Sequence, residues 1–221
     1  MSFLKTNIAD IVVGDQIYNT LQDFNLAIGN TDYIGDPVWD ESNVVFVPGR
    51  SGPLFMEAVD DWYMYREIRI ELGGLWESED WDNRISMFRN LFEKKNVKVY
   101  FRTEPEWYWR GKAHIIEFEH KRPLGSFIFA IPYADPYKYR DNVIEVESTA
   151  NGITVPCRNS RKKVYPKITT DAAITVTLDG TSVSLSPGSH QNTAIVFTQC
   201  MNELEITGAA NVKIEYSEGS L

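Results

Sequence analysis

The segment Glu67-Ile68-Arg69-Ile70-Glu71-Leu72 alternates charged and apolar residues without interruption. This period of two predicts a β-strand that buries Ile68, Ile70 and Leu72 on one face. Val97-Lys98-Val99-Tyr100-Phe101-Arg102 repeats the pattern with Val97, Val99 and Phe101. We expect a third strand over 112–120 and a fourth over 127–131. The fourth is apolar on both faces, which is typical of a central strand. Shorter strands are predicted over 16–21 and 43–47.

A single helix is predicted between these strands, over residues 80–95. Its apolar residues recur at helical spacing: Trp81, Ile85, Phe88, Leu91 and Phe92. Ser78 or Asp80 can cap the start, and Lys94 and Lys95 suit the negative end of the helix dipole. We therefore expect a mainly β protein whose N-terminal domain is α+β, with one helix packed on a β-sandwich.

The composition changes near Arg140 to Thr, Ser, Val and Gly, and no tryptophan follows Trp109. We place the domain boundary there and assign residues 1–138 and 139–221 to two domains. Asp179-Gly180 favours a two-residue type I′ turn between the strands 174–178 and 181–185. That turn would pair Val176 with Val183 and Ile174 with Leu185 on one buried face. Further strands are expected over 194–197, 203–206 and 212–216, so this domain is predicted to be a β-sandwich or jelly roll.

The net charge is −9 over 221 residues, which disfavours binding to a phosphate backbone. The first residues lack the apolar core of a signal peptide, and no stretch approaches the roughly 18 apolar residues of a membrane span. We expect a protein that is made and kept in a cytoplasm until it is released. Cys157 and Cys200 are expected to be buried thiols rather than a disulfide.

Several stretches suggest chemistry, but each lacks an essential part. Val47–Gly52 resembles a phosphate-binding loop, yet Pro53 follows it and no helix begins there. His114 and His120 would lie on one face of a strand but about 20 Å apart, too far to share a metal ion. Hydrolase signatures such as Gly-x-Ser-x-Gly are missing from the sequence. We therefore expect no enzyme activity, no cofactor and no metal site.

Two other stretches are candidates for protein contacts. Arg50 lies in a turn stiffened by proline and glycine, where it could pair across a subunit interface. Glu106-Trp107-Tyr108-Trp109-Arg110-Gly111 is the densest aromatic cluster, and on a strand Trp107 and Trp109 would share a face. Three interpretations of this cluster stay open: a strand packed on both sides, a protein interface, or a surface that stacks on sugars.

The order of the short motifs is more informative than any one of them. Val44–Gly52 is followed by Tyr63-Met64-Tyr65-Arg66-Glu67-Ile68-Arg69-Ile70, the helix, Tyr108-Trp109-Arg110-Gly111, Asp135-Pro136-Tyr137-Lys138-Tyr139-Arg140 and a small β-domain. This succession resembles the distal tail protein (Dit) family of siphophages and related prophages. The resemblance covers the N-terminal domain in order, and the C-terminal domain in size, composition and position. Ser51 departs from it, since an acidic residue is expected there most often.

The resemblance implies a structural role in the virion, at the tail tip, after assembly in the host cytoplasm. Such proteins form hexameric rings from their N-terminal domains, and their C-terminal domains are galectin-like sandwiches that project outward. One ring face meets the tail tube protein and the other meets the tail-associated, tail-tip protein. In some phages the outer domain also carries receptor-binding proteins. DNA passes through the lumen without specific binding, and no membrane contact is implied.

We expect contacts between subunits or with partners at Pro48, Gly49, Arg50, Trp107, Trp109, Arg110, Tyr137 and Tyr139. The alternative function is a glycan-binding adhesin at the tail tip, which would display its tryptophans outward. The C-terminal domain has no tryptophan, so it is not expected to bind glycans itself.

Overall fold

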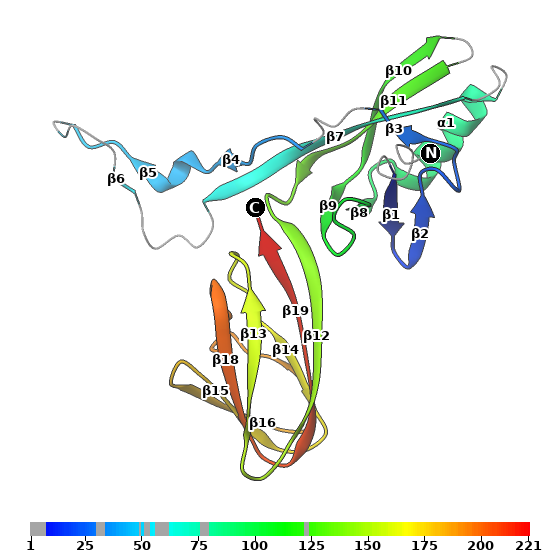
Figure 1. Ribbon diagram of the computed structural model, residues 1–221. Helices are drawn as coiled ribbons and strands as arrows, with labels where there is room; N and C mark the ends of the chain where they lie inside the picture. The colour runs from blue at the N-terminus through cyan, green and yellow to red at the C-terminus, as the bar shows by residue number, and fades with distance from the viewer. Residues whose placement is uncertain are drawn as a thin grey trace. The chain divides into compact units, whose positions relative to one another are not determined.

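A computed structural model describes residues 8–29, 34–48, 50, 54–55, 62–75, 80–121 and 124–221. The chain divides into two compact units, Met1–Lys138 and Tyr139–Leu221 (Figure 1). The described residues form antiparallel sheets and one α-helix, so the prediction of a mainly β protein is confirmed. Within these residues, no helix has the length and apolar character needed to cross a membrane.

The N-terminal unit contains two main sheets. The first has the strand order β9-β8-β1-β2 and the second has the order β10-β11-β7-β3, with β4 paired to β7. Their bounds are β1 Ala9–Val13, β2 Gln16–Asn19, β3 Ala27–Ile28, β4 Val38–Trp39, β7 Tyr63–Leu75, β8 Asn96–Phe101, β9 Tyr108–Lys112, β10 His114–Lys121 and β11 Leu124–Ala134. A separate pair joins β5 (Val44–Val45) to β6 (Leu54–Phe55), after a 3-10 helix over Glu41–Asn43.

The predicted strands of this unit are largely confirmed. Ile68, Ile70 and Leu72 are buried on one face of β7, and β11 is central because it pairs with both β7 and β10. The strand expected over 112–120 is divided at Ala113, which was not predicted. The N–H of Ala113 donates to the carbonyl oxygen of Lys95, and the carbonyl oxygen of Ala113 accepts from the N–H of Lys94. These bonds tie Ala113 to the end of the helix, so that β9 and β10 enter different sheets.

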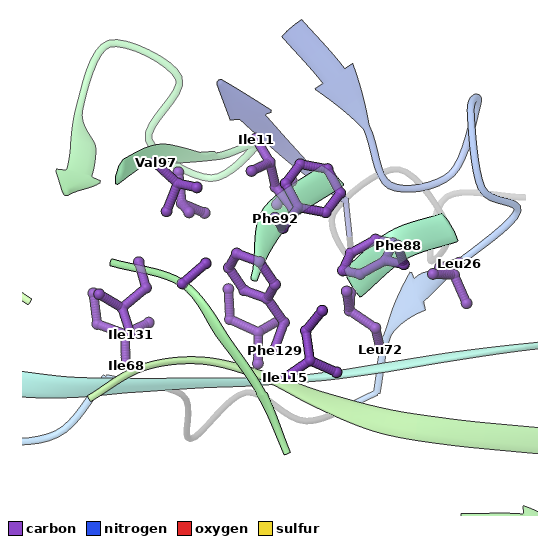
Figure 2. Close-up of a cluster of buried hydrophobic side chains, with 14 of the residues drawn as sticks. Ile11, Leu26, Ile68, Leu72, Phe88, Phe92, Val97, Ile115, Phe129 and Ile131 are labelled. Atoms are coloured by element: carbon purple, nitrogen blue, oxygen red, sulfur yellow. The ribbon is translucent and has the colours of Figure 1, made fainter. Parts of the chain in front are cut away.

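The helix α1 (Trp81–Phe92) packs into the core that the two sheets share. Figure 2 shows Phe88 and Phe92 between Ile11 and Val97 of one sheet and Ile68, Leu72 and Phe129 of the other. The centroids of the Phe88 and Phe127 rings are 4.9 Å apart, and those of Phe92 and Phe129 are 6.0 Å apart. Edge-on aromatic pairs of this kind add about 1 kcal/mol each beyond the area that they bury.

The helix ends three residues before the predicted Lys95. Glu93 has an extended ψ of 125°, and Lys94 takes the left-handed conformation with a φ of 58°. Asp80 occupies the N-cap position, but its side chain makes no capping hydrogen bond there. Ser78, the other predicted cap, lies outside the described residues.

The C-terminal unit is a sandwich of two four-stranded antiparallel sheets, β17-β14-β19-β12 and β13-β18-β15-β16. Its strands are β12 Lys138–Ser148, β13 Ile153–Asn159, β14 Lys167–Thr170, β15 Ile174–Leu178, β16 Thr181–Leu185, β17 Gly188–Gln191, β18 Cys200–Thr207 and β19 Ala210–Ser220. One buried cluster lies between the sheets and includes Val176, Phe197, Leu204 and Ile214.

The predicted hairpin of this unit is confirmed in register and in turn type. Val176 pairs with Val183 and Ile174 with Leu185. Asp179 and Gly180 both have positive φ, at 48° and 78°, as a type I′ turn requires.

Two other expectations for the C-terminal unit are wrong. Residues 194–197 form no strand, because only Phe197 pairs, through an isolated bridge to Val164. Cys157 is buried, and burial raises the pKa of its thiol to about 12. Cys200, however, is exposed, because the buried face of β18 begins only at Asn202. Both thiols are free.

Candidate interaction surface

Two of the predicted motifs meet in the N-terminal unit. The Nη2 atom of Arg110 lies 2.9 Å from Oδ2 of Asp135, and its Nε donates to the same oxygen at 3.2 Å. The backbone N–H of Asp135 also donates to the carbonyl oxygen of Arg110. Because Arg110 is exposed and doubly bonded, its guanidinium is held in one orientation at the surface.

The packing beneath the Arg110–Asp135 pair explains why residue 111 is a glycine. A Cβ atom at this position would lie 2.3 Å from Cγ2 of Ile131, closer than side-chain atoms approach one another. Only glycine lets β9 pass over β11 here, so the Arg110-Gly111 step of the motif has a steric cause.

Most aromatic rings of the two motifs are inside the chain. Tyr108, Trp109, Tyr137 and Tyr139 are all buried. The guanidinium carbon of Arg66 lies 4.5 Å from the centroid of the Trp109 ring. Burial lowers the pKa of Arg66, while the charges of Asp36 and Tyr63 act in the opposite direction. The indole face of Trp109 is therefore a favourable neighbour for the nearly buried cation of Arg66.

Trp107 differs from Trp109, although the two were expected to share a strand face. Trp107 precedes β9, and its backbone N–H donates to the carbonyl oxygen of Glu104 in a turn. Its ring is half-buried, with Nζ of Lys138 5.4 Å from the centroid. The strand alternation therefore does not extend to Trp107, and only this ring of the pair reaches the surface.

Tyr139 belongs to the C-terminal unit and is fixed by a lysine. Its hydroxyl accepts a hydrogen bond of 2.7 Å from Nζ of Lys162, which also lies 5.4 Å from the ring centroid. Tyr137 is held differently, since its backbone N–H donates to Oδ1 of Asp135 at 3.4 Å. Both rings support the local backbone rather than present a surface.

Several large apolar side chains are exposed along residues 34–48, which we call the arm. Its exposed side chains include Val38, Trp39, Val45, Phe46 and Val47, and Phe46 is 78% exposed. Pro48 and Arg50 are exposed as well, and the N–H of Arg50 donates to the carbonyl oxygen of Val47. Gly49 and residues 51–53 lie outside the described residues, and with them half of the predicted Val47–Gly52 turn.

The arm is attached to the N-terminal half of β7 (Figure 1). Val38 pairs with Tyr65, and the N–H of Gly35 donates to the carbonyl oxygen of Glu67. Aromatic contacts strengthen the attachment, since the Trp39 and Tyr63 rings lie 5.9 Å apart. The hydrogen bonds and the rings together give the arm a defined backbone path along β7.

Three exposed residues were not singled out from the sequence: Trp39 on the arm, and Met64 and Tyr133 outside it. Met64 lies four residues before Ile68 on the same strand face, so it would be expected to face the core. It is exposed because the pairing of β7 with β11 begins at Arg66, so the strand extends beyond the buried cluster. The sequence does indicate that the strand changes character here, because the aromatic residues around Met64 precede the charged alternation of residues 67–72.

One pair of titratable groups, Glu93 and His114, links the end of the helix to β10. Nδ1 of His114 lies 2.6 Å from Oε1 of Glu93, and Oε2 of Glu93 accepts the N–H of Ile115. Burial acts to raise the pKa of Glu93, but the hydrogen bonds from His114 and Ile115 and the charges of His114 and Arg89 lower it overall. The side chain of His120 lies outside the described residues. Nowhere in the described parts of the chain do three His, Cys, Asp or Glu side chains gather around a common point.

An exposed apolar surface on a well-folded unit is typical of a protein interface. The arm adds rigid aromatic rings, which are favoured where proteins dock because they lose little conformational entropy. It also carries the carboxylates of Asp36, Asp40 and Glu41. The arrangement can therefore bind an apolar protein surface, with charge at its rim.

Comparison with known proteins agrees with the fold. No protein-family model and no curated protein matches the sequence. The crystal structure of the SPP1 Dit protein, described as a paradigm of the hub adsorption apparatus in phages that infect Gram-positive bacteria, matches with a TM-score of 0.64 and 16% identity. The match covers 96% of this chain and 99% of that chain.

The protein has the fold of SPP1 Dit. This agreement spans both units and confirms the resemblance in fold that was predicted from the motif order. A designed double-stranded β-helix also overlaps 36% of this chain, at 14% identity, but its TM-score of 0.26 supports no argument.

Proposed function

We propose that this protein is a phage distal tail protein and a structural component of the tail-tip hub. The observation that carries the proposal is the shared fold over nearly the whole length of both chains. The order of motifs along the N-terminal unit supports it independently, because that order is a property of the sequence and not of the fold.

In this role the N-terminal unit, residues 1–138, forms a ring of six copies. A ring requires heterologous contacts, in which one patch meets a different patch on the neighbour. The arm is a suitable patch because it is apolar, exposed and anchored by β7. Pro48, Gly49 and Arg50 would lie in this contact, and Trp107 and Arg110 would contribute a second exposed surface. Trp109, Tyr137 and Tyr139 would act by holding the backbone, since their rings are buried.

The remaining parts of the proposal follow from the hub role. The ring joins the tail tube protein to the tail-tip protein, and DNA passes through its lumen during ejection. The C-terminal unit, residues 139–221, is a galectin-like sandwich that projects outward and can carry a receptor-binding protein. The protein acts in the virion without catalysis.

Sedimentation velocity of the full-length protein over a range of concentrations tests the ring. We expect a hexamer, formed alone or on addition of the tail-tip protein. Phe46→Asp should abolish the hexamer because it places a charge in the proposed contact. Ile17→Asp is a matched control, since Ile17 is 70% exposed on β2, away from the arm in sequence and pairing. A strict monomer in the presence of the tail-tip protein, or equal loss in both variants, would contradict the proposal.

A further inference from the structure

The strand β16 forms one edge of the sheet β13-β18-β15-β16. Exposed edges normally carry a lysine, a proline or a bulge that prevents another strand from pairing. The opposite edge, β13, has Pro156 and Arg158. The five residues of β16, Thr-Ser-Val-Ser-Leu, contain no charge and no proline, and their register with β15 is uninterrupted.

The register shows which backbone groups of β16 face outward. In a two-residue hairpin the residues that flank the turn exchange hydrogen bonds, and the pairs then alternate. Thr181, Val183 and Leu185 therefore bond to β15, whereas the N–H and C=O groups of Ser182 and Ser184 face away from it. No backbone partner is present for Ser182 or Ser184 among the described residues, which include the whole C-terminal unit.

The side chains of β16 define the strand that could pair there. Val183 is only half-buried, whereas its partner Val176 is fully buried. The inward-facing apolar side chains of the sheet are therefore not fully covered at this edge. Ser182 lies on the outer face, where its hydroxyl is 2.8 Å from that of Thr177. An added strand would continue both rows, with apolar residues beside Val183 and Leu185 and small polar residues beside the serines.

The charge of the chain indicates whether a different protein or a second copy of this chain is the better partner for β16. Each copy carries a net charge of −9, and Asp179, Glu203 and Glu205 lie exposed at the turn end of this sheet. A second copy would bring the same carboxylates to the edge. A segment with basic residues beside its apolar ones would instead be attracted.

We propose that β16 accepts an extended, basic segment of a partner protein as an added strand. Pairing would use the backbone groups of Ser182 and Ser184, and burial of Val183 would provide the apolar contribution. Strand addition of this kind derives affinity from the main chain and specificity from alternate side chains. The inference concerns the C-terminal unit and does not depend on the ring contact proposed for the arm.

The test uses the full-length protein and a short synthetic peptide that alternates valine and threonine between terminal lysines. On addition of the peptide, hydrogen exchange at the amides of Ser182 and Ser184 should slow by about tenfold or more, since both become hydrogen-bonded. The same peptide, N-methylated at alternate residues, should have no effect. Unchanged exchange at these two amides under conditions where the peptide binds would overturn the proposal.

Two substitutions distinguish the contribution of the Ser184 backbone to peptide binding from that of its side chain. Ser184→Pro removes the outward N–H without removing a bond to β15, and it should weaken peptide binding by about tenfold or more. Ser184→Ala keeps that N–H and should bind as the wild type does. Equal binding by the two variants would contradict strand addition. The proposal of a partner protein would also be contradicted if a second copy of the chain occupied this edge, which would be seen as dimers that dissociate in Ser184→Pro.

Discussion

The two units of this protein use their apolar residues in opposite ways. The exposed large apolar residues of the C-terminal sandwich, Val143, Ile153, Tyr165 and Met201, come from separate strands and loops. The N-terminal unit concentrates such residues along the arm and the adjoining half of β7. The exposed apolar side chains are therefore scattered in one unit and gathered along one segment in the other.

The tryptophans make the comparison measurable, because all six lie in the N-terminal unit. Tryptophan fluorescence therefore reports on that unit alone, while far-ultraviolet circular dichroism reports on both. A change in the fluorescence transition can therefore be assigned to the N-terminal unit.

The largest effect is expected from Phe88→Ala in the N-terminal core. Phe88 is buried among aromatic rings, and truncation should lower the free energy of unfolding by about 4 kcal/mol. The fluorescence transition in urea should shift to lower concentration, while the contribution of the sandwich to the circular dichroism transition should not. Met87→Ala is the control, because this neighbouring side chain is exposed and should cost under about 0.5 kcal/mol. Equal shifts would mean that the units unfold together.

A pH-dependent effect is expected from Glu93→Gln at the end of α1. Hydrogen bonds to a charged group contribute roughly 1.5–3 kcal/mol, so the loss at pH 7 should be about 1.5 kcal/mol. The pKa of Glu93 is lowered in the folded state, so its contribution is present above the ordinary glutamate pKa and is lost as the pH falls through the folded value. Urea titrations monitored by fluorescence should therefore show wild type and variant converging below about pH 4.

Glu147→Gln, at an exposed position of β12 in the other unit, provides the comparison for that titration. It should leave the fluorescence transition unchanged at every pH. A difference between Glu93→Gln and the wild type that persisted at low pH would show that Glu93 acts through packing instead.

A smaller effect is expected in the sandwich from Gly180→Ala. The positive φ of 78° disfavours any side chain, at about 1 kcal/mol. Circular dichroism should register the loss and fluorescence should not. Thr181→Ala, the next residue along, should be close to neutral. A fluorescence shift in Gly180→Ala would refute the independence of the two units.

The smallest effect on stability is expected from Phe46→Ser on the arm. Because the ring is mostly exposed in the single chain, its removal should change the free energy of unfolding by less than about 0.5 kcal/mol. Self-association measured by light scattering should nevertheless weaken. A large loss of stability with unchanged association would show that the arm packs on its own unit and would remove the contrast between the units.

Much of the fold could be predicted from local pattern. The alternation at residues 67–72 and 97–102, the spacing of the helix and the Asp179-Gly180 turn each depend on neighbouring residues, and each is confirmed. The break at Ala113 and the single bridge of Phe197 depend on contacts with distant segments, which local pattern does not contain.

The candidate surface was only partly predictable, for a related reason. Alternation indicates which side chains share a face, but it does not show whether another layer covers that face. Trp109 and Tyr137 were expected at an interface and are buried, whereas Trp39 and Met64 are exposed where the core ends. Motif order located the region, and tertiary packing decided which of its side chains reach the surface.

The long strand β7 has a mechanical consequence. Its first residues, Tyr63 and Tyr65, pair with the arm, and from Arg66 to Leu75 it pairs with β11, with one shift in register between Ile131 and Ala134. Ladder bonds lie across the strand direction, so a pull on the arm along β7 would load many of them at once instead of opening them one by one. The strand is therefore built to transmit tension from the arm into the core without unravelling.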